Sequence, residues 1–243
     1  MIITSLENEK IKKLLKLQKK KYRDLEDMYY VEGFHLVEEA YKAGVLLEVF
    51  QVDEEAFFDV STTLVSDGIM KRLATTDTPT NIIGVCRKKH YDKIEGNHIL
   101  LLDEIQDPGN LGTIIRSAVA FGVDMILLSE DTVDLYNSKV LRATQGLYCH
   151  IPIIEVVAKE SILSLKKNGY VICGTDVLKG KDLYTIDKSD LTKYCLIMGN
   201  EGNGVRMEIK NMCDVNFYIP MKNQVESLNV GVACSILLYE LGR

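Results

Sequence analysis

The chain has 243 residues, a formal net charge of −6 at pH 7 and 47% hydrophobic residues. This length suits two domains with ordinary hydrophobic cores and excludes a small scaffold that depends on disulfides. No apolar run approaches the length of a membrane-spanning helix, and the first residues do not predict a signal peptide. The cysteines are scattered singly, without a Cys-x-x-Cys pair, so we expect buried thiols in a reducing cytoplasm rather than disulfides or a zinc site. They are Cys86, Cys149, Cys173, Cys195, Cys213 and Cys234.

The first ninety residues alternate between helical and extended patterns. Ile11, Leu14, Leu15 and Leu17 recur at helical spacing between lysines, which predicts one amphipathic helix with a basic face over residues 6–22. The pattern that follows predicts a small α/β substrate-binding domain over residues 1–90 and a polar linker over residues 91–97. Its strands are expected at 28–31, 45–52 and 82–86, and its helices at 36–41 and 66–73.

Short apolar runs separated by helical stretches dominate the rest of the chain. Strands buried on both faces are typical of such runs, and their alternation with helices predicts a parallel α/β sheet over residues 98–243. The expected strands lie at 99–102, 125–128, 170–173, 195–198 and 215–219, and the expected helices at 111–121, 161–168 and 225–241.

Basic residues are concentrated near the start of the chain, although the net charge is negative. Phosphate binding draws much of its affinity from Lys and Arg, so this distribution matters more than the sum. By itself such a run is most often a solvated helix face, and contact with RNA is the competing interpretation. The run comprises Lys10, Lys12, Lys13, Lys16, Lys19, Lys20, Lys21 and Arg23, and a second cluster occupies residues 87–90.

Three polar segments follow apolar runs in the second half, at residues 107–116, 199–204 and 219–229. Their glycines allow a ligand to approach the backbone, and their Asn, Arg, Glu and Ser side chains offer directed hydrogen bonds. The loop at 199–204 lacks the Lys and Ser/Thr of a triphosphate-binding loop and the spacing of a dinucleotide fingerprint. None of the four histidines has a carboxylate or cysteine partner at ligand spacing, so we predict no metal site. The pattern indicates an organic cofactor and a polar substrate.

These segments resemble the SpoU/TrmH family of RNA ribose 2′-O-methyltransferases, which belong to the knotted SPOUT superfamily. Tyr22-Arg23 and the turn at 31–33 weakly resemble the RNA-binding extension of the family. The resemblance implies a C-terminal parallel sheet with a trefoil knot, S-adenosylmethionine as cofactor, a homodimer and a ribosomal-protein-like first domain. The matching residues are Asn110 and Arg116 in the first motif, Gly199, Glu201 and Gly202 in the second, and Ile219, Pro220, Ser227, Leu228 and Asn229 in the third.

The resemblance also implies roles for individual residues. Arg116 would assist deprotonation of the 2′-hydroxyl, and Glu201 would hold Arg116 in place. Because a guanidinium is in effect always protonated, polarising the hydroxyl or binding a neighbouring phosphate is the easier role for Arg116. The expected catalytic residues are Asn110, Arg116, Glu201, Ser227 and Asn229, the cofactor-binding residues are Gly199, Gly202, Ile219, Met221 and Leu228, and the RNA-binding residues are Lys19, Lys20, Lys21, Arg23 and Arg116.

The predicted function is therefore S-adenosylmethionine-dependent methyl transfer to a ribose 2′-hydroxyl of structured RNA in the cytoplasm. By analogy with the family, the front domain favours 23S ribosomal RNA over tRNA. Three alternatives stay open. They are a tRNA 2′-O-methyltransferase, a non-catalytic RNA-binding ribosome assembly factor of the same fold, and a methyltransferase that acts on a base or a small molecule.

Overall fold

The computed structural model describes residues 2–76, 78, 80–176, 180–185, 191–222 and 227–242. It divides the chain into two compact units, Met1–His90 with Asp134–His150, and Tyr91–Val133 with Ile151–Arg243. The sequence placed the segment 134–150 in the C-terminal domain, whereas in the structure it packs within the first unit. In the part of the chain that is described, no helix is both long and apolar enough to cross a membrane.

The first unit is built on a four-stranded mixed sheet in the order β1-β4-β2-β3. β1 and β2 run antiparallel to β4, and β3 runs parallel to β2. Apolar side chains of the first and fourth helices form a core on the sheet, which includes Ile11 and Ile69. The elements are α1 (Glu9–Lys16), α2 (Lys20–Glu26), β1 (Met28–Glu32), α3 (Phe34–Lys42), β2 (Leu46–Gln51), β3 (Ser61–Leu64), α4 (Asp67–Leu73), β4 (Ile82–Arg87), α6 (Ser138–Thr144) and the 3-10 helix η1 (Leu147–Cys149).

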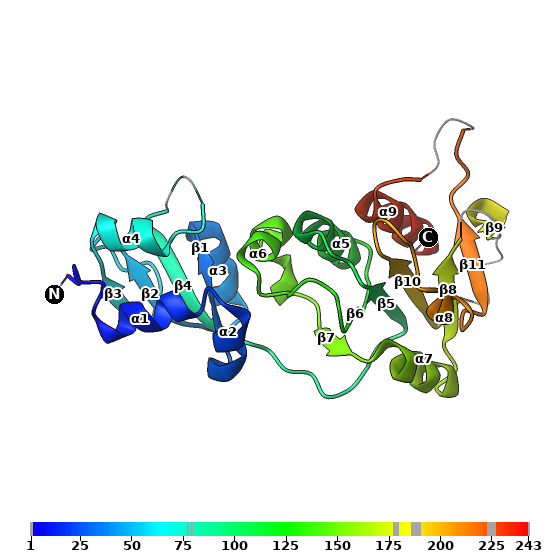
Figure 1. The fold of residues 1–243 in the computed structure, drawn as a ribbon, viewed down its shortest axis with the longest axis horizontal. Helices are drawn as coiled ribbons and strands as arrows, with labels where there is room; N and C mark the ends of the chain where they lie inside the picture. The colour runs from blue at the N-terminus through cyan, green and yellow to red at the C-terminus, as the bar shows by residue number, and fades with distance from the viewer. Residues whose placement is uncertain are drawn as a thin grey trace. The chain divides into compact units, whose positions relative to one another are not determined.

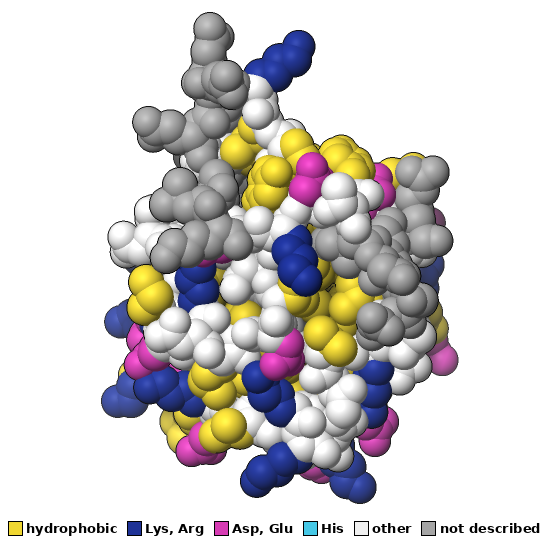
Figure 2. Space-filling model, turned by 90° about the vertical axis from the view of Figure 1, so that its right-hand side faces the viewer, with side chains coloured by type: hydrophobic (Ala, Val, Ile, Leu, Met, Phe, Trp, Pro, Cys, Tyr) yellow, Lys and Arg dark blue, Asp and Glu magenta, His cyan; other side chains and the backbone are white. Residues whose placement is uncertain are grey.

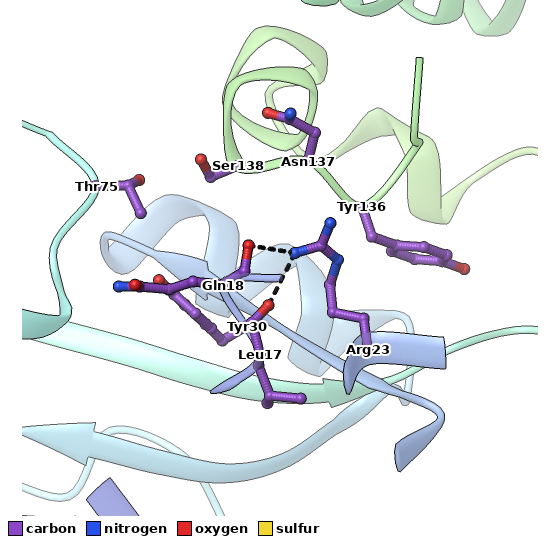
Figure 3. Close-up of a pocket in the computed structure, with 8 residues that line it drawn as sticks. All are labelled: Leu17, Gln18, Arg23, Tyr30, Thr75, Tyr136, Asn137 and Ser138. Carbon is purple, nitrogen blue, oxygen red and sulfur yellow. Dashed lines mark hydrogen bonds between the residues drawn. The ribbon is translucent and has the colours of Figure 1, made fainter. Parts of the chain in front are cut away.

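The predicted single helix over residues 6–22 is wrong, because the chain forms α1 and α2 with a break between them. Arg23 explains where the break falls. Its Nη1 donates to the carbonyl oxygens of Leu17 at 2.8 Å and Gln18 at 2.9 Å (Figure 3). In a continuous helix these carbonyls would accept the backbone N–H groups four residues further on. The predicted apolar stripe is present, with Ile11 and Leu14 fully buried on α1.

The segment 134–150 is held in the first unit by aromatic and polar contacts. The ring of Tyr136 lies 4.4 Å from that of Tyr29, and the hydroxyls of Tyr29 and Tyr148 share a hydrogen bond of 3.0 Å. Burial raises the pKa of both Tyr29 and Tyr148 well above the ordinary value, so both phenols stay neutral. Arg142 on α6 donates to Thr75 at 2.7 Å. The sequence predicted no element here because its apolar residues are too few for a periodic signal.

The second unit contains a seven-stranded, all-parallel sheet in the order β7-β6-β5-β10-β8-β11-β9. The parallel α/β sheet predicted from the sequence is therefore confirmed. Figure 1 shows α5 and α9 side by side on one face of this sheet. The elements are β5 (His98–Asp103), α5 (Pro108–Ala120), β6 (Met125–Ser129), β7 (Ile153–Val156), α7 (Ala158–Lys167), β8 (Val171–Thr175), β9 (Lys181–Asp182), the 3-10 helix η2 (Leu183–Thr185), β10 (Tyr194–Gly199), α8 (Met207–Lys210), β11 (Val215–Tyr218) and α9 (Val230–Leu241).

The central strands of this sheet are buried on both faces. Successive side chains of a strand point to opposite faces, so Ile99 and Leu101 of β5 face one side and Leu100 and Leu102 the other. All four are fully buried. Ile99 and Leu101 pack with Ile162 of α7 in one apolar cluster. The sheet therefore needs a layer of helices on each face, as its nearly continuous apolar strands predict.

All six cysteines are unpaired, as expected from their scattered positions. Five are buried and Cys213 is half-buried. Burial raises the pKa of Cys173 to about 12, so its thiol is uncharged and unreactive at neutral pH.

The ion pair between Arg23 and Asp134 should contribute strongly to the stability of the first unit. Both side chains are nearly buried, at 8% and 12% exposure. Replacing Arg23 by Met leaves the Asp134 carboxylate without its cation, so we expect a loss of about 3–5 kcal/mol in the free energy of unfolding measured in urea. The matched control is Lys13→Met, which removes an exposed partner of Glu26 and should change stability by about 1 kcal/mol or less. Equal effects of the two substitutions would contradict the expectation.

Candidate active site

The three polar segments meet at one edge of the parallel sheet. The first follows β5, the second follows β10 and the third follows β11. β5 and β10 are neighbours in parallel register, with Gly199 opposite Asp103. The carboxyl ends of parallel strands form a single edge, where open α/β sheets bind their ligands. The topology thus brings together residues that are more than a hundred positions apart in the chain.

A continuous chain of hydrogen bonds joins the three segments. The Glu201 carboxylate accepts the backbone N–H groups of Gln106 at 3.2 Å and Asp107 at 3.1 Å, and the Asn110 side-chain amide at 3.0 Å. Asn110 Oδ1 in turn accepts Asn229 Nδ2 at 2.8 Å. Three of the five predicted catalytic residues are therefore in direct contact.

Helix capping fixes the orientation of the two amides. Asp107 caps α5, with Pro108 in its first turn, and accepts the backbone N–H of Asn110 at 2.8 Å. Asn229 caps α9 by accepting the N–H groups of Gly231 and Val232 at 2.9 and 3.3 Å. Asn229 Oδ1 accepts the N–H groups of its own helix. Its Nδ2 is therefore oriented to donate to Asn110.

Two local expectations are corrected by this capping. Asn110 lies inside the first turn of α5 rather than on the turn before it, because Asp107 takes the cap. The last helix, expected over residues 225–241, begins at Val230 with Asn229 as its cap. Ser227 lies two residues before the cap and lines the pocket described below. The predicted start of this helix at residues 225–226 lies outside the described residues.

The hydrogen bonds also determine the charge of Glu201. Burial by itself would raise its pKa, but the bonds from Asn110 and from the backbone of Asp107 and Gln106 outweigh burial and hold the pKa below the ordinary value of 4.5. At neutral pH the carboxylate is thus an ionised acceptor with three donors in place. Its environment suits an orienting group better than a proton donor.

A pocket of about 310 Å³ opens beside this hydrogen-bonded chain. Apolar side chains such as Met198, Phe217 and Leu237 form part of its wall. Thr175 and Asp176, which the sequence interpretation missed, lie in its lining at the end of β8. All five predicted cofactor-binding residues line the pocket, together with Glu201 and Ser227; the five are Gly199, Gly202, Ile219, Met221 and Leu228.

The loop at 199–204 is closely folded against its own ends. A Cβ on Gly199 would lie 2.1 Å from the backbone nitrogen of Val205, so no other residue fits there. Gly204 has a φ of +69°, which favours glycine. Asn200 donates to the carbonyl of Glu104 at 2.9 Å and accepts the N–H of Gly202 at 2.9 Å. The loop backbone therefore has a fixed shape on the side of the pocket.

An ion pair that the sequence interpretation missed holds Arg206, the second residue after this loop. The fully buried Asp103 carboxylate accepts Arg206 Nε at 2.8 Å and the Arg206 backbone N–H at 2.9 Å, and Arg206 Nη2 lies 2.6 Å away. These contacts raise the pKa of Arg206 further above its ordinary value. The available signal was a carboxylate at the end of a fully apolar strand, since such a buried charge requires a partner.

Arg116 is not part of this cluster. It is exposed on α5 and does not line the pocket, and its side chain makes no hydrogen bond or ion pair with the described residues. Asn110 and Arg116 are six residues apart, about one and two-thirds helical turns, so they leave α5 on different faces. Glu201 therefore holds Asn110, and not Arg116 as expected.

The basic residues predicted to bind RNA also separate in the structure. Lys19, Lys20 and Lys21 are exposed at the start of α2, whereas Arg23 is buried and bound to Asp134. On the face of the second unit that carries β9 and β11, the described side chains of both charges are interspersed with apolar ones (Figure 2). The lysines on α2 are the clearer candidate for contact with phosphate groups.

His35 and His150 do have carboxylate neighbours in the structure, contrary to the expectation from spacing. His35, Glu38 and Glu39 on α3 place potential ligand atoms within 4.8 Å of one another. His150 Nε2 lies 2.8 Å from Glu39, a contact between segments that are distant in the sequence. Lys42 pairs with Glu38 at 3.2 Å and with Glu39 at 3.1 Å, so the carboxylates already have a cation.

Comparisons with known proteins agree on one family. A family model described as SpoU rRNA Methylase family matches residues 97–239, and the MRM3-like substrate binding domain matches residues 8–84. The 23S rRNA (guanosine(2553)-2′-O)-methyltransferase RlmP of Bacillus subtilis is 38% identical over 245 residues, which cover 98% of both chains. The crystal structure of an AdoMet-bound rRNA methyltransferase from Sinorhizobium meliloti has a TM-score of 0.88 at 28% identity, covering 99% of this chain and 97% of that one.

Replacing Glu201 by Gln tests the hydrogen-bonded chain through its pH dependence. Because the folded-state pKa of Glu201 is lowered, its ionised form stabilises the fold above the unfolded pKa of about 4.5, and that stability is lost as the pH falls through the folded pKa. We expect Glu201→Gln to be less stable than the wild type at pH 7 and the difference to shrink steadily below about pH 4.5. Urea unfolding between pH 3 and 7 measures it, and a difference that is independent of pH would contradict the assignment.

Proposed function

Because the chain belongs to the SpoU rRNA methylase family, we propose that it transfers a methyl group from S-adenosylmethionine to a ribose 2′-hydroxyl of 23S ribosomal RNA. The observation that carries the proposal is the hydrogen-bonded chain from Glu201 through Asn110 to Asn229 beside a pocket at the carboxyl edge of the sheet. RlmP, by its name, modifies guanosine 2553, and that nucleotide is the first position to examine.

The pocket residues fit the proposed cofactor in size and chemistry. Its volume of about 310 Å³, its partly apolar wall and its few polar groups are typical of a site for a small organic ligand. Gly199, Gly202, Ile219, Met221 and Leu228 would hold S-adenosylmethionine there. When bound, that cofactor supplies an electrophilic methyl group on a sulfonium. No thiol or metal ion of the protein is needed for such a transfer.

The residues of the hydrogen-bonded chain would position the acceptor ribose. Asn110 and Asn229 hold each other in one orientation, and Glu201 fixes Asn110, so this edge of the pocket is organised before the substrate arrives. Ser227 would add a hydroxyl to the same rim. The guanidinium of Arg116 is exposed on α5, away from this cluster, and would bind a phosphate of the substrate.

The first unit would bind the RNA. Its match to a substrate binding domain and the exposed Lys19, Lys20 and Lys21 support this part of the proposal. Arg23 would contribute indirectly, since its contacts with Leu17 and Gln18 orient the start of α2. A ribosomal RNA substrate is favoured over tRNA by the name of the relative that matches along nearly the whole chain.

A homodimer, a trefoil knot and a cytoplasmic location complete the proposal. Val232 and Tyr239 of α9 are each 47% exposed, and Phe121 packs against Tyr239 at a ring distance of 5.7 Å. Exposed apolar side chains on a helix that is otherwise packed on the sheet support a second copy at this position. The knot is supported by the overall similarity to solved structures of rRNA methyltransferases. An rRNA substrate supports the location.

Methyl transfer is tested with labelled S-adenosylmethionine and total RNA from a strain that lacks the gene. We expect label in a 2′-O-methylated nucleoside of 23S rRNA. Asn110→Ala and Arg116→Ala should each lower kcat by about a hundredfold, a loss typical of a missing positioning or electrostatic group, with cofactor affinity within about twofold of the wild type.

Each other outcome of that assay selects a different function. Label in tRNA would support the tRNA enzyme, and label in a base would support a base methyltransferase. Cofactor binding without transfer to any RNA would favour an assembly factor. Loss of cofactor binding in Asn110→Ala would contradict a role at the ribose.

The lysines of α2 are tested by RNA affinity as a function of salt. Lys19→Ala with Lys21→Ala removes two cations, so the slope of log affinity against log salt concentration should become shallower by about 1.4–1.8. The matched control is Lys71→Ala with Arg72→Ala, which removes two exposed cations of α4 in the same unit. Equal slopes for the two variants would show that the α2 lysines form only a solvated face.

A further inference from the structure

Asp176 is a buried carboxylate in the wall of the cofactor pocket that no predicted motif includes. It follows β8 directly and is 8% exposed. Its backbone is fixed on both sides, because its N–H donates to the carbonyl of Phe217 at 3.0 Å and its carbonyl accepts the N–H of Gly180 at 2.9 Å. A side chain on Gly180 would collide with the carbonyl oxygen of Asp176, its Cβ lying 2.5 Å away. The position of Asp176 in the pocket is thus determined by the backbone.

Lys210 compensates the charge of this carboxylate. Its Nζ, at the end of α8, lies 2.5 Å from Asp176 Oδ2. A buried carboxylate is costly unless it is paired, and Lys210 supplies the opposite charge. An ionised carboxylate accepts stronger hydrogen bonds than a neutral group does. A ligand in the pocket therefore meets a strong acceptor whose net charge is already balanced.

We propose that the Asp176 carboxylate binds the ribose hydroxyls of the cofactor, an inference that rests on the proposed function. β8 and β11 are adjacent and parallel, with Thr175 opposite Phe217. Asp176 therefore lies beside the strand that leads to Ile219 and Met221, whose apolar side chains line the pocket and would pack against the adenine ring. The ribose is joined to the adenine, so its hydroxyls are the nearest donors that the cofactor can offer to this wall.

The charge balance favours hydroxyls over the two cationic groups of the cofactor. A sulfonium or an ammonium at Asp176 would also lie within a few ångströms of the Lys210 ammonium, and like charges at that distance repel. A hydroxyl is a neutral donor and avoids this repulsion. Asp176 is thus assigned to recognition of the nucleoside part of the cofactor and not of its reactive sulfur.

Binding titrations with three ligands test the assignment. S-Adenosylmethionine, S-adenosylhomocysteine and 5′-methylthioadenosine share the ribose, the second lacks the sulfonium charge, and the third lacks both that charge and the amino-acid group. We expect Asp176→Asn to weaken all three by the same factor of about tenfold or more, the loss typical of hydrogen bonds to a charged group. Weakening of S-adenosylmethionine alone would assign Asp176 to the sulfonium. Weakening of the first two ligands only would assign it to the ammonium, and either result overturns the proposal.

Asp214→Asn is the matched control. Asp214 also pairs with a lysine, Lys166, at 2.6 Å and lies just before β11, but it does not line the pocket. It should leave all three affinities unchanged. Binding by Asp176→Asn with wild-type affinity overturns the inference alone, whereas failure of the wild-type protein to bind any of the ligands overturns the proposed function.

A second measurement needs no variant and therefore no assumption that Asp176→Asn folds. The wild-type protein should bind 5′-methylthioadenosine about tenfold or more tightly than its 2′,3′-dideoxy counterpart, because the latter lacks the hydroxyls that would donate hydrogen bonds to the carboxylate. Equal affinities would show that the pocket does not recognise the ribose hydroxyls and would overturn the proposal.

Discussion

The organisation of the candidate active site depends on a single carboxylate. Glu201 lies in the glycine-rich loop that follows β10. Its carboxylate accepts three hydrogen bonds from a second loop and a helix, α5, which both follow β5. Through Asn110 this contact extends to Asn229, the cap of the last helix. Strand ends bring these segments near one another, but only directed hydrogen bonds determine how their side chains face. An acceptor with a depressed pKa is suited to this task, because it keeps its charge and therefore all its donors across the neutral pH range.

Much of the fold could be predicted from the sequence because the spacing of apolar residues indicates which faces of a helix or strand are buried. Fully apolar strands such as β5 and β10 are buried on both faces, and the prediction located them to within about a residue. The elements that were missed are short or lie at edges, such as β3, β7 and β9, where few residues are buried and the periodic signal is weak. The break between α1 and α2 could not be predicted, because it depends on Arg23 reaching back to two carbonyls, a contact that periodicity does not encode.

The site could be predicted only as a set of motif residues, and their resemblance to the SpoU/TrmH family is confirmed by the family model and by the similarity to RlmP. The interactions among them required coordinates. Sequence reasoning paired Glu201 with Arg116, yet helical phase directs Arg116 away from the cluster. Asp103, Arg206 and Asp176 were missed because each is a single charged residue at the end of a strand or loop. Their significance arises from burial and from a partner that is distant in the chain.

The segment 134–150 is part of the first structural unit although it lies in the second half of the chain. It belongs in sequence to the methylase half, yet it covers Tyr29 and supplies the carboxylate for Arg23 in the first unit. The peptide chain therefore passes between the two units three times, after His90, Val133 and His150. A fragment cut at residue 90 would expose an aromatic surface and retain an uncompensated guanidinium. The first unit is thus not separable at residue 90, because the later segment 134–150 completes its packing and its charge balance.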